Sequence, residues 1–316
     1  MFIMDQSKGL LKQGSPDSKR IRKIAESVIG LPTLPTVVSK MIDLVDSPRT
    51  SAALLARLIS SDQALTAKVL KLANSAYYGF PREISTVNMA IVVLGFNAVK
   101  EMGLSISVFD VFKKTASSAI FDVARFWEHS VGCGTASRML ARTYRPAIAG
   151  EAFVAGLLHD VGKVILKQYF DNELARIISL QKENGISLEE AEASVIETTH
   201  AQIGSWLAEK WNLPKIICET ILHHHDAWES MVENEFVACV QLGDYLCHMA
   251  KIGQSGRLAA PVLDEKLWEV FRSAGIALDE SFLPGLQTEF LLEFDKSETF
   301  LSMVSDQPDG RTEEPV

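Results

Sequence analysis

The stretch GEAFVAGLLHDVGKVILKQYF, residues 150–170, decides the fold, because its apolar residues recur at helical spacing around the single ionisable pair His159-Asp160. An ionisable pair within so apolar a segment must be solvated, paired or ligated if it is to be tolerated at a buried position. The segment therefore indicates a helical core with a polar centre.

The histidines outside this stretch are clustered in the same part of the chain. Six of the seven lie between positions 129 and 225, and the first 128 residues contain none. Imidazole nitrogens together with carboxylate oxygens suit iron, zinc, nickel or manganese. The clustering therefore predicts a helical domain that carries a metal.

Helical periodicity recurs along most of the chain, and no β-type alternation or internal repeat stands out. The pattern predicts a long helix that ends near Phe112 and a last helical segment over residues 263–304. Residues 5–18 and the tail from Ser305 are polar and contain Pro and Gly, so we expect both ends to be loose. Pro48 is predicted to end a helix. The predicted helix starts are Thr50-Ser51, Asp62, Thr86, Ser187 with Glu190, and Thr199 with Gln202.

Composition excludes several classes of function. The formal charge of -9 argues against nucleic-acid binding, which depends on Lys and Arg neutralising phosphates, and the basic residues at 19–23 are read as a solvated helix face. The four cysteines lack C-x-x-C spacing, which predicts buried free thiols. No apolar run approaches the length of a membrane span, so we expect a cytoplasmic protein without a membrane partner.

Five segments resemble the HDOD module of bacterial signalling proteins, a relative of the HD and HD-GYP metal-dependent phosphohydrolases. The resemblance extends in order over roughly residues 31–250, and ANSAYYG followed by LGF is far more specific than a His-Asp dipeptide. The segments are LPTLPTVVSKMIDLVDSP (31–48), SSDQALTAKVLKLANSAYYGFPREISTVNMAIVVLGF (60–96), LLHDVGK (157–163), THAQIGSWLAEKWNLP (199–214) and ILHHHD (221–226).

The resemblance implies an all-α fold, in which an N-terminal helical bundle packs on an HD-type helical domain followed by C-terminal helices. It implies a variable segment over 1–30, the bundle over 31–115, the HD-like metal-binding domain over 120–255, a C-terminal helical segment over 256–304 and a flexible tail over 305–316.

The resemblance also implies a set of metal ligands. Many HDOD proteins have lost these residues, whereas this chain has residues of the required type at every position. His223 falls where the family has another residue, so we exclude it, and His248 is assigned a structural role. The predicted ligands are His129, His159, Asp160, His200, His224, His225 and Asp244.

Three further positions bear on the predicted site. Lys163 either faces an anionic ligand or is a surface lysine, and Gly162 is expected to permit a close backbone approach. Arg125 stands where some HD-GYP phosphodiesterases have an acidic residue for an extra ion, so it argues against a third metal. We expect one or two divalent transition-metal ions, iron first, with manganese, zinc or nickel as alternatives.

Three functions stay open at this stage. The first is a signalling or regulatory protein that acts mainly through contacts with other signalling proteins. The second is a phosphohydrolase acting on a nucleotide or other phosphoester, with Asp160 and Lys163 as catalytic candidates. The third is a di-iron oxygenase of the HD type. The chain reads AWESMVENE after HHHD and lacks the D-G-x-G-Y-P stretch of the HD-GYP phosphodiesterases, which weighs against hydrolysis of a cyclic dinucleotide. The oligomeric state is not predicted.

Overall fold

The computed structural model describes residues 33–44, 48–230, 233–257 and 262–305, and every regular element in these ranges is a helix. The predicted all-α class is confirmed. No helix within the described ranges is both long enough and apolar enough to cross a membrane. The predicted variable segment 1–30, the basic residues 19–23 and the tail beyond residue 305 lie outside the described residues.

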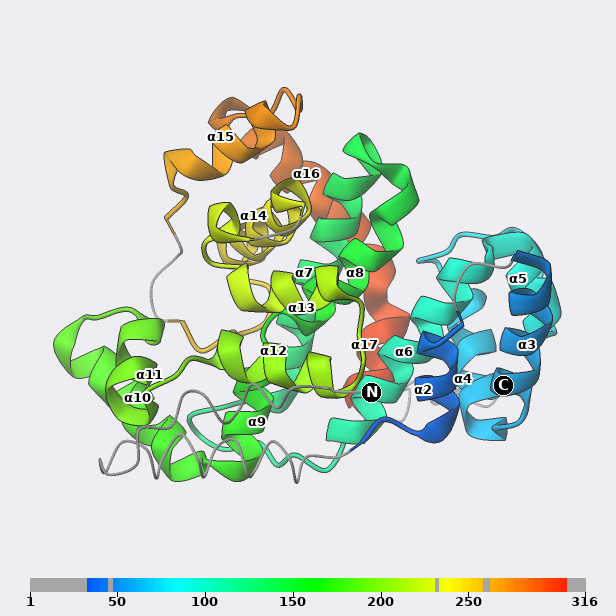
Figure 1. Ribbon diagram of the computed structural model, residues 1–316, viewed down its shortest axis with the longest axis horizontal. Coiled ribbons are helices and arrows are strands. Elements are labelled where there is room, and N and C mark those ends of the chain that lie inside the picture. The colour runs from blue at the N-terminus through cyan, green and yellow to red at the C-terminus, as the bar shows by residue number, and fades with distance from the viewer. Residues whose placement is uncertain (1–32, 45–47, 231–232, 258–261, 306–316) are drawn as a thin grey trace, which may run out of the picture.

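The first half of the chain folds into a bundle at one end of the molecule, where α2 to α6 pack on one another (Figure 1). Its helix starts follow the predicted caps, since the Asp62 side chain accepts a hydrogen bond from the N–H of Leu65 and Thr86 accepts one from Met89. The bundle helices are α2 (Thr36–Ile42), α3 (Pro48–Ser60), α4 (Gln63–Ala73), α5 (Val87–Leu94) and α6 (Phe96–Phe112).

One predicted boundary in the bundle is wrong. Pro48 does not end a helix and Thr50-Ser51 do not cap one, because α2 already ends at Ile42 and α3 begins at Pro48 itself. Proline is well suited to the first helical position, where its fixed φ fits and no N–H partner is needed. The proline is therefore a start signal here.

The loop between α4 and α5 is closed by the side chain of Asn74. Its amide accepts from the N–H of Ile84 at 2.7 Å and donates to the carbonyl of Ile84 at 2.9 Å. Within the loop, Tyr77 lies against the guanidinium of Arg138 on α7 (Val123–Tyr144), 4.7 Å from the ring centroid. The loop thus joins the bundle to the second half of the molecule.

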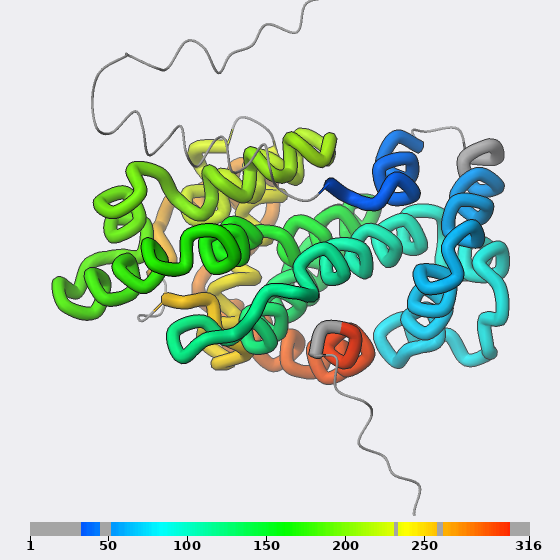
Figure 2. The backbone as a smooth tube through the Cα atoms, turned by 90° about the horizontal axis from the view of Figure 1, so that it is seen from below, coloured from blue at the N-terminus to red at the C-terminus, as the bar shows by residue number. Residues whose placement is uncertain are grey.

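The second half is built around α7, whose long face packs against α8 and α14. Helix α13 packs on α8, and α12 packs on both α9 and α13, so that segments far apart in the sequence surround the turn between α8 and α9 (Figures 1 and 2). The four cysteines of this half are buried free thiols, as predicted. Its helices are α8 (Ala149–Leu158), α9 (Val161–Tyr169), α10 (Asp171–Asn184), α11 (Leu188–Ile196), α12 (His200–Lys210), α13 (Lys215–His223) and α14 (Asn234–Ala250).

The last helical segment, predicted as continuous over 263–304, is broken into α15 (Glu265–Ser273), α16 (Leu283–Phe294) and α17 (Glu298–Ser305). The break after α15 contains Gly275 at φ +75°, a left-handed conformation that ends a helix. Helices α16 and α17 then return along α7.

An aromatic cluster connects the three parts of the chain. Phe300 on α17 is fully buried, and its ring centroid lies 5.0 Å from that of Tyr77 and 5.0 Å from that of Phe153 on α8. A single continuous apolar core includes residues from the bundle, the second half and the C-terminal helices. The predicted domain boundaries therefore stay a prediction, while the packing joins the three parts.

Candidate metal centre

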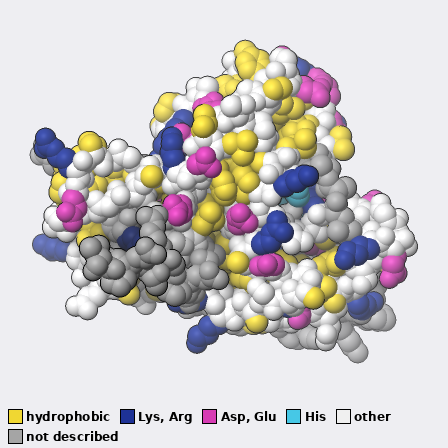
Figure 3. Space-filling view, turned by 180° about the vertical axis from the view of Figure 1, so that it is seen from behind, with side chains coloured by type: hydrophobic (Ala, Val, Ile, Leu, Met, Phe, Trp, Pro, Cys, Tyr) yellow, Lys and Arg dark blue, Asp and Glu magenta, His cyan; other side chains and the backbone are white. Residues whose placement is uncertain are grey.

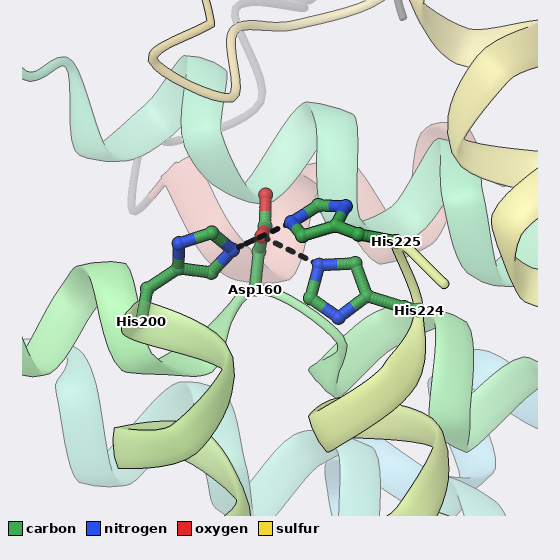
Figure 4. Close-up of side chains that lie close together, drawn as sticks. All are labelled: Asp160, His200, His224 and His225. Carbon is green, nitrogen blue, oxygen red and sulfur yellow. Dashed lines mark hydrogen bonds and ion pairs between the residues drawn. The ribbon is translucent and has the colours of Figure 1, made fainter. Parts of the chain in front are cut away.

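The structure brings all seven predicted ligands together in two neighbouring groups. Within each group the potential ligand atoms lie within 4.8 Å of one another. The first group is Asp160, His200, His224 and His225 (Figure 4), and the second is His129, His159 and Asp244.

Five separate elements supply these side chains. His129 lies on α7 and Asp244 on α14, while His200 is the first residue of α12. His159-Asp160 forms the tight turn between α8 and α9, and His224-His225 follows the last residue of α13. The predicted close approach at Gly162 is confirmed, because a Cβ there would lie 1.9 Å from the carbonyl oxygen of His200. The glycine lets α9 meet the start of α12.

The Asp160 carboxylate stands between the two groups. Its Oδ1 lies 3.2 Å from Nε2 of His200 and 3.4 Å from Nε2 of His224, and Figure 4 shows these rings turned toward it. Its Oδ2 lies 3.3 Å from Nε2 of His159 in the second group. One carboxylate therefore faces ligand atoms of both groups, as a bridging ligand would.

In the second group, the Asp244 carboxylate joins two histidines. Its Oδ1 lies 2.9 Å from Nε2 of His129 and 3.7 Å from Nε2 of His159. All three side chains are at least nine-tenths buried. Nitrogen and oxygen donors thus converge in a site from which bulk water is largely excluded.

Four of the histidine rings are held by the nitrogen that faces away from the centre. Nδ1 of His159 donates to a backbone carbonyl at 2.7 Å, and Nδ1 of His224 donates to another at 2.8 Å. Nδ1 of His129 lies 3.4 Å from a carbonyl, and Nδ1 of His200 lies 2.8 Å from a carboxylate. A ring that keeps its proton on Nδ1 directs the lone pair of Nε2 inward once Nε2 is deprotonated, which is the usual arrangement of metal-binding histidines. The accepting residues are Gly156, Ile221, Ile252 and Glu192.

Several inward-facing atoms have no hydrogen-bond partner among the described residues. They are Nε2 of His159, Nε2 of His224 and Oδ1 of Asp160, all buried. Leaving a buried polar atom unpaired costs about 1–3 kcal/mol. A divalent cation would satisfy these atoms together, so the residues present fit a metal.

Burial and neighbouring charges shift the pKa values of Asp160, His159 and His224. Burial raises the pKa of Asp160, but His159 and Lys163 hold it well below its ordinary value. Burial lowers the pKa of His159, but the Asp160 carboxylate outweighs it and raises that pKa well above 6.5. Burial lowers the pKa of His224 to about 4, so this ring is neutral near pH 7 and has a lone pair for a metal.

Lys163 is buried, with 2% of its surface exposed, so the alternative of a surface lysine is wrong. Its Nζ lies 2.7 Å from Oδ2 of Asp160. The ammonium group therefore balances the carboxylate that faces both groups. Contact of Lys163 with an anionic ligand stays a prediction.

Two histidines that were left out of the ligand set lie outside the two groups. His223 is ion-paired with Glu219 on the same helix turn. Nε2 of His248 is hydrogen-bonded to the Ser255 hydroxyl at 2.9 Å and lies 3.6 Å from Oδ1 of Asp244. His248 thus borders the second group and helps to anchor the chain beyond α14.

Sequence reasoning missed three residues that contact the predicted ligands. Glu192 on α11 is fully buried and accepts hydrogen bonds from both Nδ1 and the backbone N–H of His200. Glu189 and Arg257 both contact His225. The only signal was the inward spacing of Glu192 with the apolar residues of its helix, whereas Arg257 comes from a loop with no recognisable pattern.

The centre reaches the surface at one edge. The side chains of His225 and His248 retain 15% and 14% of their exposure, whereas His159 and His200 retain none. Seen from behind, a histidine lies at the surface between Lys and Arg side chains (Figure 3). His225 and His248 are therefore the histidines of this region that are partly open to solvent.

Comparison with known proteins finds relatives that share this fold. A solved structure of an HDOD domain protein of unknown function from Geobacter sulfurreducens superposes with a TM-score of 0.76 at 28% identity, covering 90% of this chain and 98% of that one. A candidate phosphohydrolase from Shewanella amazonensis shares the fold, with a TM-score of 0.68 at 22% identity, covering 89% of this chain and 98% of that one.

An uncharacterized protein of Treponema pallidum (strain Nichols) is 26% identical over 210 residues, which is 66% of this chain and 40% of the length of that relative. The family model of the HDOD domain matches residues 31–227, well over half of the chain. The chain belongs to the HDOD family.

Proposed function

We propose that this protein is a regulatory HDOD module of a bacterial signalling system, that its centre holds one or two divalent transition-metal ions, and that it acts mainly through contacts with other proteins. The observation that carries the metal proposal is the shared orientation of His129, His159, His200 and His224. Each ring is fixed through Nδ1 and directs Nε2 toward a carboxylate.

The donor set suits iron first, with manganese, zinc or nickel as alternatives, because it combines imidazole nitrogens with carboxylate oxygens. Asp160 would serve ions in both groups through its two oxygens. Glu192 would orient His200 from outside the centre.

The regulatory role is supported by the size and surface of the N-terminal bundle. The helices α2 to α6 form more than a lid over the centre, and two large apolar side chains on them face solvent. Val92 on α5 is 84% exposed and Leu54 on α3 is 41% exposed. We take these two side chains as candidate contact points for the partner protein that the proposal requires.

A second candidate function, hydrolysis of a phosphoester, is favoured by the burial of Asp160 and Lys163 beside the histidines. Bound divalent ions would supply a water of lowered pKa and would polarise phosphoryl oxygens. Of the chain's own groups, Asp160 would stay ionised and Lys163 would place positive charge next to an anionic ligand.

The metal proposal is tested by elemental analysis of protein purified without a histidine tag. His224→Ala should lower the bound metal per chain by at least half, whereas His223→Ala, one residue earlier and outside both groups, should leave it unchanged. Equal metal content in both variants, or no metal in the native protein after incubation with Fe²⁺ or Mn²⁺, would refute it.

The regulatory and catalytic proposals are separated by a second experiment. Val92→Glu should reproduce the phenotype of a deletion strain while metal content is unchanged, and Val262→Glu, at a side chain 90% exposed outside the bundle, should not. Turnover of any member of a phosphoester panel with Mn²⁺ or Fe²⁺, lost in His159→Ala, would shift the assignment to catalysis.

A further inference from the structure

His248 lies as close to the second group as one of the group's own members does. Its Nε2 is 3.6 Å from Oδ1 of Asp244, while Nε2 of His159 is 3.7 Å from the same oxygen. Its ring centroid is 5.2 Å from that of His129, while the ring centroid of His159 is 5.5 Å from it. By both measures His248 is as close to Asp244 and His129 as His159 is.

The positions of Asp244 and His248 on α14 suit a shared ion. Residues four positions apart lie on the same face of a helix, and two ligands with this spacing can bind one metal ion. Two neighbouring ligand atoms that are each about 2.0–2.2 Å from one ion lie roughly 3–3.5 Å apart. The 3.6 Å between Nε2 of His248 and Oδ1 of Asp244 is close to that spacing, so only a small movement of the ring is needed.

A strap, residues 252–257, holds His248 beside His129. Gly253, at φ +63°, packs so closely on α7 that a Cβ would lie 2.2 Å from the backbone nitrogen of His129. The Ser255 hydroxyl of the same strap is hydrogen-bonded to Nε2 of His248 at 2.9 Å. A hydrogen bond to a neutral hydroxyl contributes only about 0.5–1.5 kcal/mol, so a bond between this nitrogen and a metal could replace it at small cost.

We propose that His248 is a further metal ligand of the second group, and that its Nε2 leaves the Ser255 hydroxyl to bind the same ion as His129 and Asp244. The proposal rests on the proposed metal centre. Catalytic metal sites keep one position open for water or substrate, whereas structural sites are closed by protein ligands. A side chain at this position would therefore close the second group, which favours the regulatory role over hydrolysis.

The first test measures the affinity of the metal-free protein for Co²⁺ alone, by competition with a chelating dye. His248→Ala should weaken the binding of one ion by at least about tenfold, because an imidazole ligand is lost. Ser255→Ala should bind at least as tightly as the native protein, because Nε2 of His248 then has no hydroxyl to leave. His223→Ala, which removes a histidine outside both groups, should match the native protein.

The second test locates the ion directly. Anomalous diffraction from crystals of the Co²⁺-loaded native protein should place an ion about 2.0–2.2 Å from Nε2 of His248, with the Ser255 hydroxyl no longer bonded to that nitrogen. An ion bound by His129 and Asp244 with Nε2 of His248 more than about 3 Å away would overturn the proposal.

The outcomes separate the role of His248 from the metal proposal on which it rests. A loss of affinity in Ser255→Ala as large as that in His248→Ala overturns the ligand role alone, because the ring would then only anchor the strap. Equal Co²⁺ affinity in His248→Ala and His223→Ala also overturns the ligand role alone. No binding of Co²⁺ by the native protein overturns both proposals.

Discussion

Replacing Glu192 by Gln tests whether a carboxylate outside the predicted ligand set controls the centre. Glu192 is fully buried on α11, and its two oxygens lie 2.9 and 2.8 Å from Nδ1 of His200. One of them also accepts the backbone N–H of His200 at 3.0 Å. Glu192 therefore fixes the ring, its proton and the start of α12 at once.

The expected loss of metal affinity follows from the contacts with His200 that a glutamine at position 192 can still make. A glutamine keeps one acceptor oxygen but presents an NH₂ group where the second oxygen stood, so one of the two contacts with His200 must be lost. Burial lowers the pKa of His200, and the Glu192 carboxylate more than offsets this, so the charge also supports electron density on the ring. Loss of such an orienting carboxylate costs about 10–100-fold in metal affinity, or about 1.4–2.7 kcal/mol.

The assay is competition for Zn²⁺ between the protein and a chelating dye, with thermal unfolding of each metal-free variant as a check on folding. Glu190→Gln is the matched control, because Glu190 is exposed on the same helix and glutamine can keep its place in the capping box with Ser187. A Glu192→Gln protein that folds normally and binds within twofold of Glu190→Gln would refute the orienting role.

Three further predictions concern stability and packing. Burial, followed by the neighbouring Glu151 carboxylate, raises the pKa of Glu101 from 4.5 to about 8, so the folded state holds the extra proton and the free energy of unfolding should fall as pH rises from 4.5 to 8. Glu101→Gln should remove this decline and be on the order of 1–3 kcal/mol more stable than the native protein at pH 8, as measured by urea unfolding at pH 5 and pH 8. An equal change in the free energy of unfolding between the two pH values in both proteins would contradict this. Phe300→Ala should cost about 3–5 kcal/mol in the same assay, because it empties the aromatic cluster that joins α17 to both halves, and a loss below about 1 kcal/mol would show that α17 is not anchored there. Gly162→Ala should lower both the melting temperature and the bound metal, because its Cβ would push α9 from the start of α12; unchanged metal by elemental analysis would show that the contact does not position His200.

Much of the fold could be predicted because its signals are local. The caps at Asp62 and Thr86 and the capping box of Ser187 with Glu190 depend only on residues three positions apart, and all are confirmed. Pro48 was misread because proline suits both the end of one helix and the first turn of the next. The prediction of one continuous helical segment over 263–304 was wrong, because apolar periodicity alone does not show where a chain turns.

The candidate metal centre also has a part that could be predicted from the sequence and a part that could not. The family pattern names the seven residues that converge, and the structure brings them together in two groups. It does not name Glu192, Glu189 or Arg257, because their contacts with His200 and His225 arise only when distant segments meet. A pattern of ligand types also cannot indicate the position of a proton on a ring, which is set by the hydrogen bond that the other ring nitrogen makes.

The predicted ligands differ in the contacts that the surrounding protein makes with them, and the difference indicates the order in which they would join a metal. Buried atoms of His159, His224 and Asp160 have ion-pair contacts but no hydrogen-bond partner among the described residues, and an ion that satisfied them would be favoured. Both ring nitrogens of His225 already have neighbours, because the Arg257 guanidinium lies 2.9 Å from Nδ1 and 3.2 Å from Nε2, and the Glu189 carboxylate lies 2.9 Å from Nε2. Binding to the unpaired atoms gains stability at once, whereas binding that uses His225 must first replace existing hydrogen bonds. The first ion is consequently expected next to the unpaired atoms, and the ring of His225 is the last ligand to join.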